Sequence, residues 1–144
     1  MPEAVSREDP VFVPGAPRPV GAYAHARRAG GLLYLCGVGP RRPGSDEIPG
    51  GPIRDPDGTP RDYDVTAQTR SVIDNVRTIL LAAGSSLEKV IDVTVFVVDM
   101  RRDFAAVNAV WEEHFGAILP ARTTLEVGAL PTPIAVEFKV IARE

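Results

Sequence analysis

The stretch PARTTLEV at residues 120–127, followed by VEFK at residues 136–139, predicts two successive β-strands near the end of the chain. Side chains alternate between the two faces of a strand, so Arg122 and Thr124 share one face while apolar Leu125 lies on the other. The last strand alternates in the same way and also places apolar side chains on both faces. Each face of the sheet therefore needs something to cover it.

Two helical patterns precede these strands. In the first, Asp64 caps an apolar stripe that Gly84 ends, and the second starts near Asp103 and ends at Gly116. Between them, residues 90–98 are rich in β-branched residues, which is typical of a strand. Alternation predicts that one face of this strand carries Ile91, Val93, Val95 and Val97.

The apolar run at residues 32–38 predicts a buried strand, and Phe12–Val13 and Ala22–Ala24 predict shorter strands that pair near it. The resulting order is β-β-α-β-α-β-β, an α+β fold with both helices packed on one face of the sheet. Because two helices can cover only one face, we expect the other face to pack against further copies of the chain. Periodicity does not give the number of copies.

Residues 39–62 read as one long loop, rich in proline and glycine and without an apolar period. Loops longer than about 12–15 residues are uncommon inside a compact domain and are usually functional or disordered. The whole chain, residues 1–144, is expected to form a single domain that includes this loop.

Composition excludes several classes of function. The 144 residues are 44% hydrophobic and 24% charged, and the net charge of -3 gives no reason to expect nucleic-acid binding. No apolar run approaches the roughly 20 residues that span a bilayer. Residues 1–4 contain no basic segment leading into an apolar core, so a cytoplasmic location is expected. Cys36 is the only cysteine, and His25 and His114 are far apart, so no disulfide and no metal site are expected.

The two final strands carry the candidate chemistry. Arg122 presents a planar fork of donors that matches a carboxylate, and Glu137 can accept a hydrogen bond from water and move its protons. Such a pair is typical of a hydrolytic site for small organic acids. The alternative is a surface pair of strands joined by an ordinary salt bridge.

A set of motifs distributed along the chain resembles the Rid/YjgF family of imine and enamine deaminases, from about Gly21 to Ala142. In order, the motifs are Gly21-Ala22-Tyr23, Leu35-Cys36-Gly37, Gln68-Thr69-Arg70, Asp74-Asn75-Val76, Ala82-Ala83-Gly84-Ser85-Ser86-Leu87, Thr94-Val95-Phe96, Asp103-Phe104-Ala105-Ala106-Val107-Asn108 and PARTTLEV. The resemblance implies a chorismate-mutase-like fold and a homotrimer with the second sheet face turned inward. It also implies three sites at the subunit interfaces, with no metal or organic cofactor.

The N-terminal half is similar, more narrowly, to 2-aminomuconate deaminases. This similarity rests on GAYAHARRAGGLLYLCG at residues 21–37, Arg41-Arg42-Pro43 and the long loop. It implies hydrolytic release of ammonia from a six-carbon unsaturated diacid in aromatic catabolism. Two alternatives remain open: a broad-specificity deaminase of 2-iminoacids, and a non-catalytic trimer that binds small acids. Ribonuclease activity, also ascribed to parts of the family, fits the acidic balance of the chain poorly.

The resemblance assigns roles to individual residues. Arg122 matches the carboxylate-binding arginine, and Glu137 matches the glutamate that activates water. Tyr23 matches a tyrosine in the wall of the pocket, and Thr124 and Asn108 also match substrate-site positions. A helix-packing role for Asn108 is an equally good interpretation.

The strand at residues 32–38 supplies two further candidates. Cys36 stands where many relatives have serine, next to Gly37, whose backbone is expected to face the substrate. Cys36 is either a weak polar contact to the substrate or a small buried hydrophobe.

Lys139, on the last strand, replaces an acidic residue that is common in the family. One interpretation places its side chain outside the pocket.

A diacid substrate would need a second cation. Arg41 and Arg42 at the start of the long loop, with His25 near Tyr23, are the candidates for its second carboxylate. Alternatively, the two arginines pair within the loop with Asp46 and Glu47.

Overall fold

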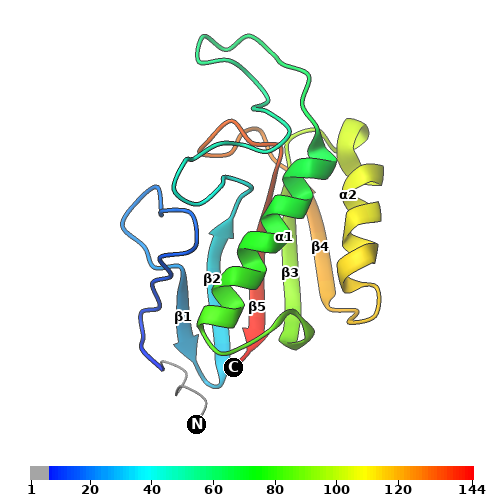
Figure 1. Ribbon diagram of the computed structural model, residues 1–144. Helices are drawn as coiled ribbons and strands as arrows, with labels where there is room; N and C mark the ends of the chain where they lie inside the picture. The colour runs from blue at the N-terminus through cyan, green and yellow to red at the C-terminus, as the bar shows by residue number, and fades with distance from the viewer. Residues whose placement is uncertain (1–6) are drawn as a thin grey trace.

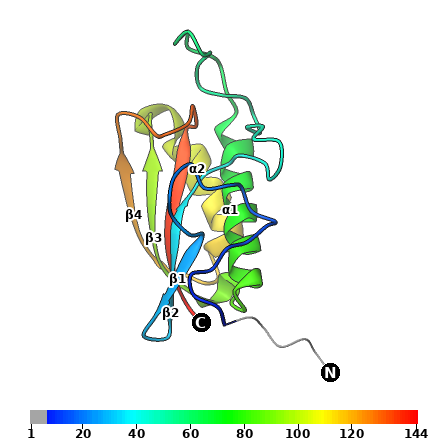
Figure 2. The ribbon, with the colours of Figure 1, turned by 90° about the vertical axis from the view of Figure 1, so that its left-hand side faces the viewer.

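The computed structural model describes residues 7–144, and the segment Met1–Ala4 considered above for a secretory signal lies outside them. Over the described range the chain forms two layers, with a mixed β-sheet on one side and two α-helices on the other (Figures 1 and 2). The elements are β1 (Ala26–Ala29), β2 (Leu32–Val38), α1 (Val65–Ala82), a short 3₁₀ helix (Leu87–Lys89), β3 (Val90–Val97), α2 (Met100–Phe115), β4 (Ala121–Glu126) and β5 (Val136–Arg143). No helix in this range is both long and apolar enough to cross a membrane.

The order of the strands across the sheet is β1-β2-β5-β3-β4. Strands β3 and β4 run parallel, and the other neighbouring pairs are antiparallel. The last strand of the chain thus lies in the middle of the sheet, while β4 lies at its edge. The strands that carry Arg122 and Glu137 follow each other in sequence but are separated in space by β3.

Helix α1 is the element that the sequence predicts best. The Asp64 side chain accepts a hydrogen bond from the backbone nitrogen of Ala67, 3.1 Å away, which caps the first turn. The helix ends at Ala82, and Gly84 follows with a φ of 84°, the left-handed conformation that glycine adopts easily.

Helix α2 begins earlier than the sequence predicted. Its cap is Asp99, whose side chain accepts from the backbone nitrogen of Arg102, so the predicted start near Asp103 is wrong by about one turn. Asp103 is instead buried inside the first turn, where Tyr63 donates to its carboxylate at 2.6 Å. The predicted end at Gly116 is confirmed.

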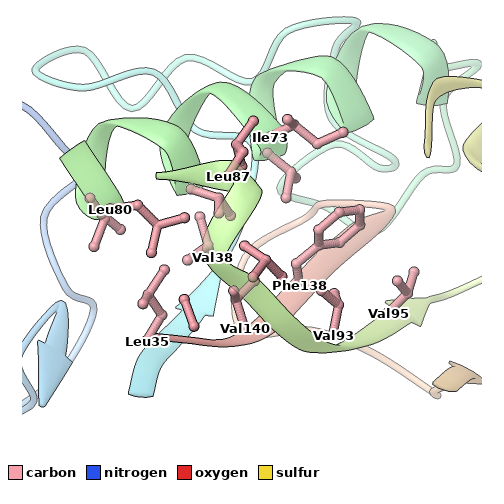
Figure 3. Close-up of a cluster of buried hydrophobic side chains, with 14 of the residues drawn as sticks. Leu35, Val38, Ile73, Leu80, Leu87, Val93, Val95, Phe138 and Val140 are labelled. Carbon is pink, nitrogen blue, oxygen red and sulfur yellow. The ribbon is translucent and has the colours of Figure 1, made fainter. Parts of the chain in front are cut away.

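The core fills the space between the helices and one face of the sheet, as the α+β prediction required. Figure 3 shows Ile73 and Leu80 of α1 packed over Val93, Phe138 and Val140 of the central strands. These five side chains are almost completely buried. Both helices therefore cover the same face and leave the other without a protein layer in a single copy (Figure 2).

The alternation predicted for β3 fails at one position. The pairing of β3 with β5 is irregular between Val90 and Asp92, which shifts the register there. Val90 and Val93 both face the core as a result, and Ile91 is 40% exposed instead of buried. Strict alternation cannot anticipate such a bulge.

The predicted N-terminal strands are also corrected. Residues 22–24 form no strand; β1 starts two residues later, at Ala26. Val11, next to the predicted Phe12–Val13 pair, forms a single bridge with Ala26. The chain between them is a loop that occupies the edge of the sheet beside β1.

Polar side chains of α1 hold the first half of the long loop against the domain. The amide nitrogen of Asn75 donates to the backbone oxygens of Gly39 and Arg41 at 2.9 and 3.0 Å, and Gln68 donates to that of Gly51 at 2.9 Å. Residues 54–62 project beyond the ends of the strands (Figure 1). Gln68 and Asn75, part of the motifs quoted above, thus serve as tethers for the loop.

Removing one tether should be measurable as a loss of stability. Asn75 is buried, so Asn75→Ala would leave two backbone oxygens without their donor, and we expect it to lower the free energy of unfolding by about 2 kcal/mol. Urea denaturation of both proteins would measure the difference. Thr78→Ala is the matched control, because the Thr78 hydroxyl bonds only its own helix and is more exposed. Equal stability of the Asn75 variant and wild type would contradict the tethering role.

Candidate functional site

The carboxylate of Glu137 packs directly against the backbone of β2. A Cβ atom added to Gly37 would lie 2.7 Å from Glu137 Oε2, a distance that real Cβ contacts do not show. Glycine at residue 37 therefore makes the room in which the carboxylate sits. Next to it is a hollow of about 240 Å³, lined by Val20, Tyr23, Gly37, Gly39, Arg41, Pro131, Thr132, Ile134 and Glu137.

Burial raises the pKa of the Glu137 carboxyl, and the positive charge of Arg41 partly opposes this shift. A carboxyl whose pKa is raised exchanges protons closer to neutral pH than an exposed glutamate does. This property suits a group that takes a proton from water and passes it on.

The contact between Gly37 and Glu137 predicts a specific loss of activity. In Gly37→Ala the added methyl group must displace the carboxylate, which is the far end of a flexible side chain, so the fold should tolerate the change. If Glu137 moves protons in a reaction of this protein, turnover should fall by about tenfold to a hundredfold, the scale of a misplaced catalytic group, with little change in melting temperature. Gly128→Ala is the control, since among the described residues nothing lies within 4 Å of its added Cβ. Full activity of the Gly37 variant would exclude this packing as functionally important.

Cys36 and Tyr23 border the same region. Cys36 is half-buried against the core, and burial is the main cause that raises the pKa of its thiol. The thiol is therefore a poor nucleophile, in agreement with the interpretation of Cys36 as a small apolar or weakly polar contact. The Tyr23 hydroxyl accepts a hydrogen bond from the backbone nitrogen of Val20 at 3.0 Å, which fixes the ring at the mouth of the hollow.

Arg41 lines the hollow and is also bound within its own loop. Its side chain is 17% exposed, and its guanidinium donates to Asp46 and to the backbone oxygen of Arg18, both at 2.8 Å. Arg42 is exposed and lies 3.7 Å from Glu47. The pairing within the loop, one of the two interpretations of these arginines, is thus observed for both, and only Arg41 also lines this hollow.

The two histidines have structural contacts. His25 is buried, its Nδ1 accepts from the backbone nitrogen of Val13 at 2.9 Å, and its Nε2 lies 2.8 Å from the backbone oxygen of Pro17. Both ring nitrogens are occupied by backbone partners, so His25 holds residues 13–17, and its contact with substrate stays a prediction. His114 bonds the Val110 oxygen of its own helix. Among residues 7–144, no group of three His, Cys, Asp or Glu side chains is arranged to hold a metal ion.

Arg122 lies in a separate cluster beside α2. Its Nη1 donates to the side-chain oxygen of Asn108 at 2.9 Å, and its guanidinium carbon is 5.0 Å from the centre of the Trp111 ring and 5.9 Å from that of Phe104. Cation–π contacts of this kind hold a guanidinium while leaving part of its donor fork available. No sequence pattern indicated this aromatic support, because Trp111 is expected in the core of any such helix.

The two clusters are on opposite faces of the sheet. Arg122 pairs with Val93, which lies on the helix-covered face, and the register of β3 with β4 places Thr124 on that face too. Glu137 pairs with Phe96 on the uncovered face. Within one copy the described residues therefore form no salt bridge between Arg122 and Glu137, and one copy does not join the arginine to the carboxylate.

Several residues that line the hollow beside Glu137 come from loops, and no sequence pattern predicted them. Val20 and the segment 131–134 close two sides of the hollow, but they carry no charged group that would single them out. Val20 lies in the loop before β1, and residues 131–134 lie in the loop between β4 and β5, at the end of the sheet where β2 finishes and β5 begins. Loops at one end of a sheet commonly form binding sites.

Comparison with known proteins supports the resemblance. Residues 14–144 match the sequence model of the family described as endoribonuclease L-PSP. A RutC family protein of Pyrococcus horikoshii is 42% identical over 132 residues, 92% of this chain and 94% of the relative. The 2-iminobutanoate/2-iminopropanoate deaminase of Escherichia coli is 35% identical, with coverage of 88% and 91%. The structure of Escherichia coli TdcF with bound serine aligns at a TM-score of 0.78 with 29% identity, covering 93% of this chain and 98% of that chain.

Proposed function

This chain belongs to the endoribonuclease L-PSP family, which includes the Rid/YjgF proteins, and on that premise we propose that it is a hydrolytic deaminase of imine and enamine carboxylic acids. The observation that carries the proposal is the half-buried Glu137 in a hollow beside Gly37, with a pKa raised by burial. A water-activating carboxylate of this kind needs an anchor for the acid group of the substrate. Arg122 is the candidate for that anchor.

Arg122 can serve the Glu137 hollow only from another copy. We propose a homotrimer in which the uncovered sheet faces turn inward and the β4 edge of one subunit approaches the Glu137 hollow of the next. Two features support this arrangement: the two clusters lie on opposite faces, and exposed apolar residues such as Leu125 stand on the uncovered face or its edge. Asn108 and Thr124 would then complete the site together with Arg122, from the same subunit.

The reaction needs no cofactor. Protonation of an enamine at carbon gives the iminium form of the imine, and water then adds to its carbon while Glu137 accepts one of the water protons. Transfer of that proton to the amino group lets ammonia leave as the C–O bond becomes a carbonyl. The hydroxyl proton is released at the same time and replaces the proton taken up at carbon. Arg122 holds the carboxylate next to the reacting carbon throughout, which keeps that carbon against the water.

Two classes of substrate fit this chemistry. The six-carbon diacid 2-aminomuconate is favoured by the sequence of the N-terminal half and by the cations near the hollow. Short 2-iminoacids are favoured by the name of the Escherichia coli relative, 2-iminobutanoate/2-iminopropanoate deaminase. Both need one carboxylate anchor, and only the diacid needs a second.

Ammonia release by the purified protein tests the proposal. We expect hydrolysis above the uncatalysed rate when the imine of alanine or 2-aminomuconate is generated in situ. A preference of a hundredfold in kcat/KM for the diacid, about 2.7 kcal/mol of transition-state discrimination, would identify the catabolic enzyme. The opposite preference would identify a broad 2-iminoacid deaminase. No release from either substrate would overturn the deaminase and favour a protein that only binds small acids.

A further inference from the structure

Lys139 lies on the uncovered face of β5, two residues after Glu137. Its register partners are Gly37 on β2 and Thr94 on β3, so its side chain stands in the middle of that face. It is half-buried, and its ammonium group donates to the backbone oxygen of Leu35. One interpretation of the sequence placed Lys139 outside the pocket, whereas in the structure it lines a groove.

That groove has a volume of about 1040 Å³ and adjoins the Glu137 hollow at Tyr23, which lines both. Its wall also includes Cys36 and the side of the loop before β1. The hollow beside Glu137 and the groove beside Lys139 are therefore neighbours that share Tyr23 as a lining residue. In the proposed trimer both lie on the face that turns toward the next subunit, so a substrate reaching from Glu137 to Lys139 would lie between subunits.

The charges along the groove are unbalanced. Its lining contains the cations Arg18, Arg27 and Lys139 and, among the described residues, no aspartate or glutamate. Arg27 forms an ion pair with Asp9 at 2.9 Å, but no described carboxylate lies within 4 Å of the Lys139 ammonium. A half-buried ammonium group that bonds a neutral backbone oxygen but no carboxylate keeps an unbalanced charge, and a bound anion would offset that unfavourable energy.

We propose that Lys139 binds the second carboxylate of a dicarboxylic imine or enamine whose reacting carbon lies at Glu137, an inference that rests on the proposed deaminase function. Residues two apart on a strand are separated by about 7 Å, which suits an acid with a chain of five or six carbons. An ammonium group has three donors, and the contact with Leu35 uses one of them. Arg41, the candidate from sequence for this second anchor, is already neutralised by Asp46.

Lys139→Met tests the assignment. Imines would be generated in situ by amino-acid oxidases from alanine, with one carboxylate, and from glutamate, with two. We expect the variant to lose about tenfold to a hundredfold in kcat/KM on the two-carboxylate imine, the strength of a charge-assisted hydrogen bond, mainly through KM. Activity on the one-carboxylate imine should change by less than about twofold, and Lys139→Arg should retain most activity on both.

Two further variants keep the test decisive. Arg42→Met removes an exposed cation of the long loop and should leave the ratio between the substrates unchanged, which controls for general electrostatic attraction. Lys139→Gln removes the charge but keeps a donor for Leu35, and replaces Lys139→Met if that variant fails to fold or assemble. An equal loss on both substrates, or none on the two-carboxylate imine, would overturn the role of Lys139. Absence of activity in the wild-type protein on both imines would overturn the proposed function instead.

Discussion

Arg122→Ala is expected to lower kcat/KM for an imine acid by about a thousandfold, roughly 4 kcal/mol of transition-state stabilisation. The variant removes the proposed partner of the substrate carboxylate and leaves that carboxylate desolvated without a cation. Because Arg122 is only partly buried and its hydrogen bond is to Asn108, the melting temperature should change little. Steady-state ammonia release measures the first effect, and circular dichroism on heating measures the second. Retention of most activity would contradict the anchor role.

Mixing two inactive variants tests where the anchor comes from. A site built from Arg122 of one copy and Glu137 of the next would be intact once in every mixed trimer of Arg122→Ala and Glu137→Gln chains. If chains exchange at random, about a quarter of wild-type activity should return on co-refolding an equal mixture. Two variants that stay inactive together, although they form mixed trimers by mass, would show that the two residues do not act across a subunit interface.

Glu137→Gln is expected to lower kcat by a factor of about 10²–10⁴, the usual contribution of a general acid–base group. Glutamine has nearly the same shape, so the contact with Gly37 is kept and KM should change little. Fold and assembly should be unaffected, as thermal unfolding and size-exclusion chromatography would show. A Glu137 variant with wild-type kcat would leave the hollow as a binding site only.

The raised pKa of Glu137 also predicts how activity and stability depend on pH. If the ionised carboxylate takes the proton of water, kcat/KM should fall as pH drops through this raised pKa, at a higher pH than for an exposed glutamate. The linked effect on stability has the opposite direction. The folded protein holds this proton more tightly than the unfolded chain does. The stability that Glu137 contributes is therefore complete below the pKa of the group in the unfolded chain, and it is lost as pH rises through the pKa in the folded protein. Urea denaturation of wild type and Glu137→Gln at several pH values would measure the difference.

Local patterns predicted the elements well because their causes are local. The cap at Asp64 and the glycine at residue 84 define α1 within one turn, and the β-branched run of β3 is typical of a strand. Sheet order is not local, since the chain returns to insert β5 between β2 and β3. For that reason the sequence pattern predicted that Arg122 and Glu137 lie close together, whereas the strand register puts them on opposite faces of the sheet.

The same distinction explains the individual site residues. Gly37, Tyr23 and Cys36 gather around Glu137 because they lie on or before β2, which pairs directly with β5. His25 was expected to bind substrate from its residue type, but its partners are backbone atoms of a loop that no periodicity describes. The sequence pattern predicted no substrate contact for Lys139 for a similar reason, because only the pairing of β5 with β2 brings this residue to the groove.

The position of β4 has a consequence for handling the protein. As one of the two edge strands, it presents a row of backbone N–H and C=O groups along one side, with Leu125 nearly half exposed beside them. Free strands of this kind pair readily with unrelated chains and start aggregates. A variant designed to disrupt the proposed trimer would leave this edge exposed. Such a design should add a lysine or a proline along β4, so that loss of assembly is not mistaken for loss of solubility.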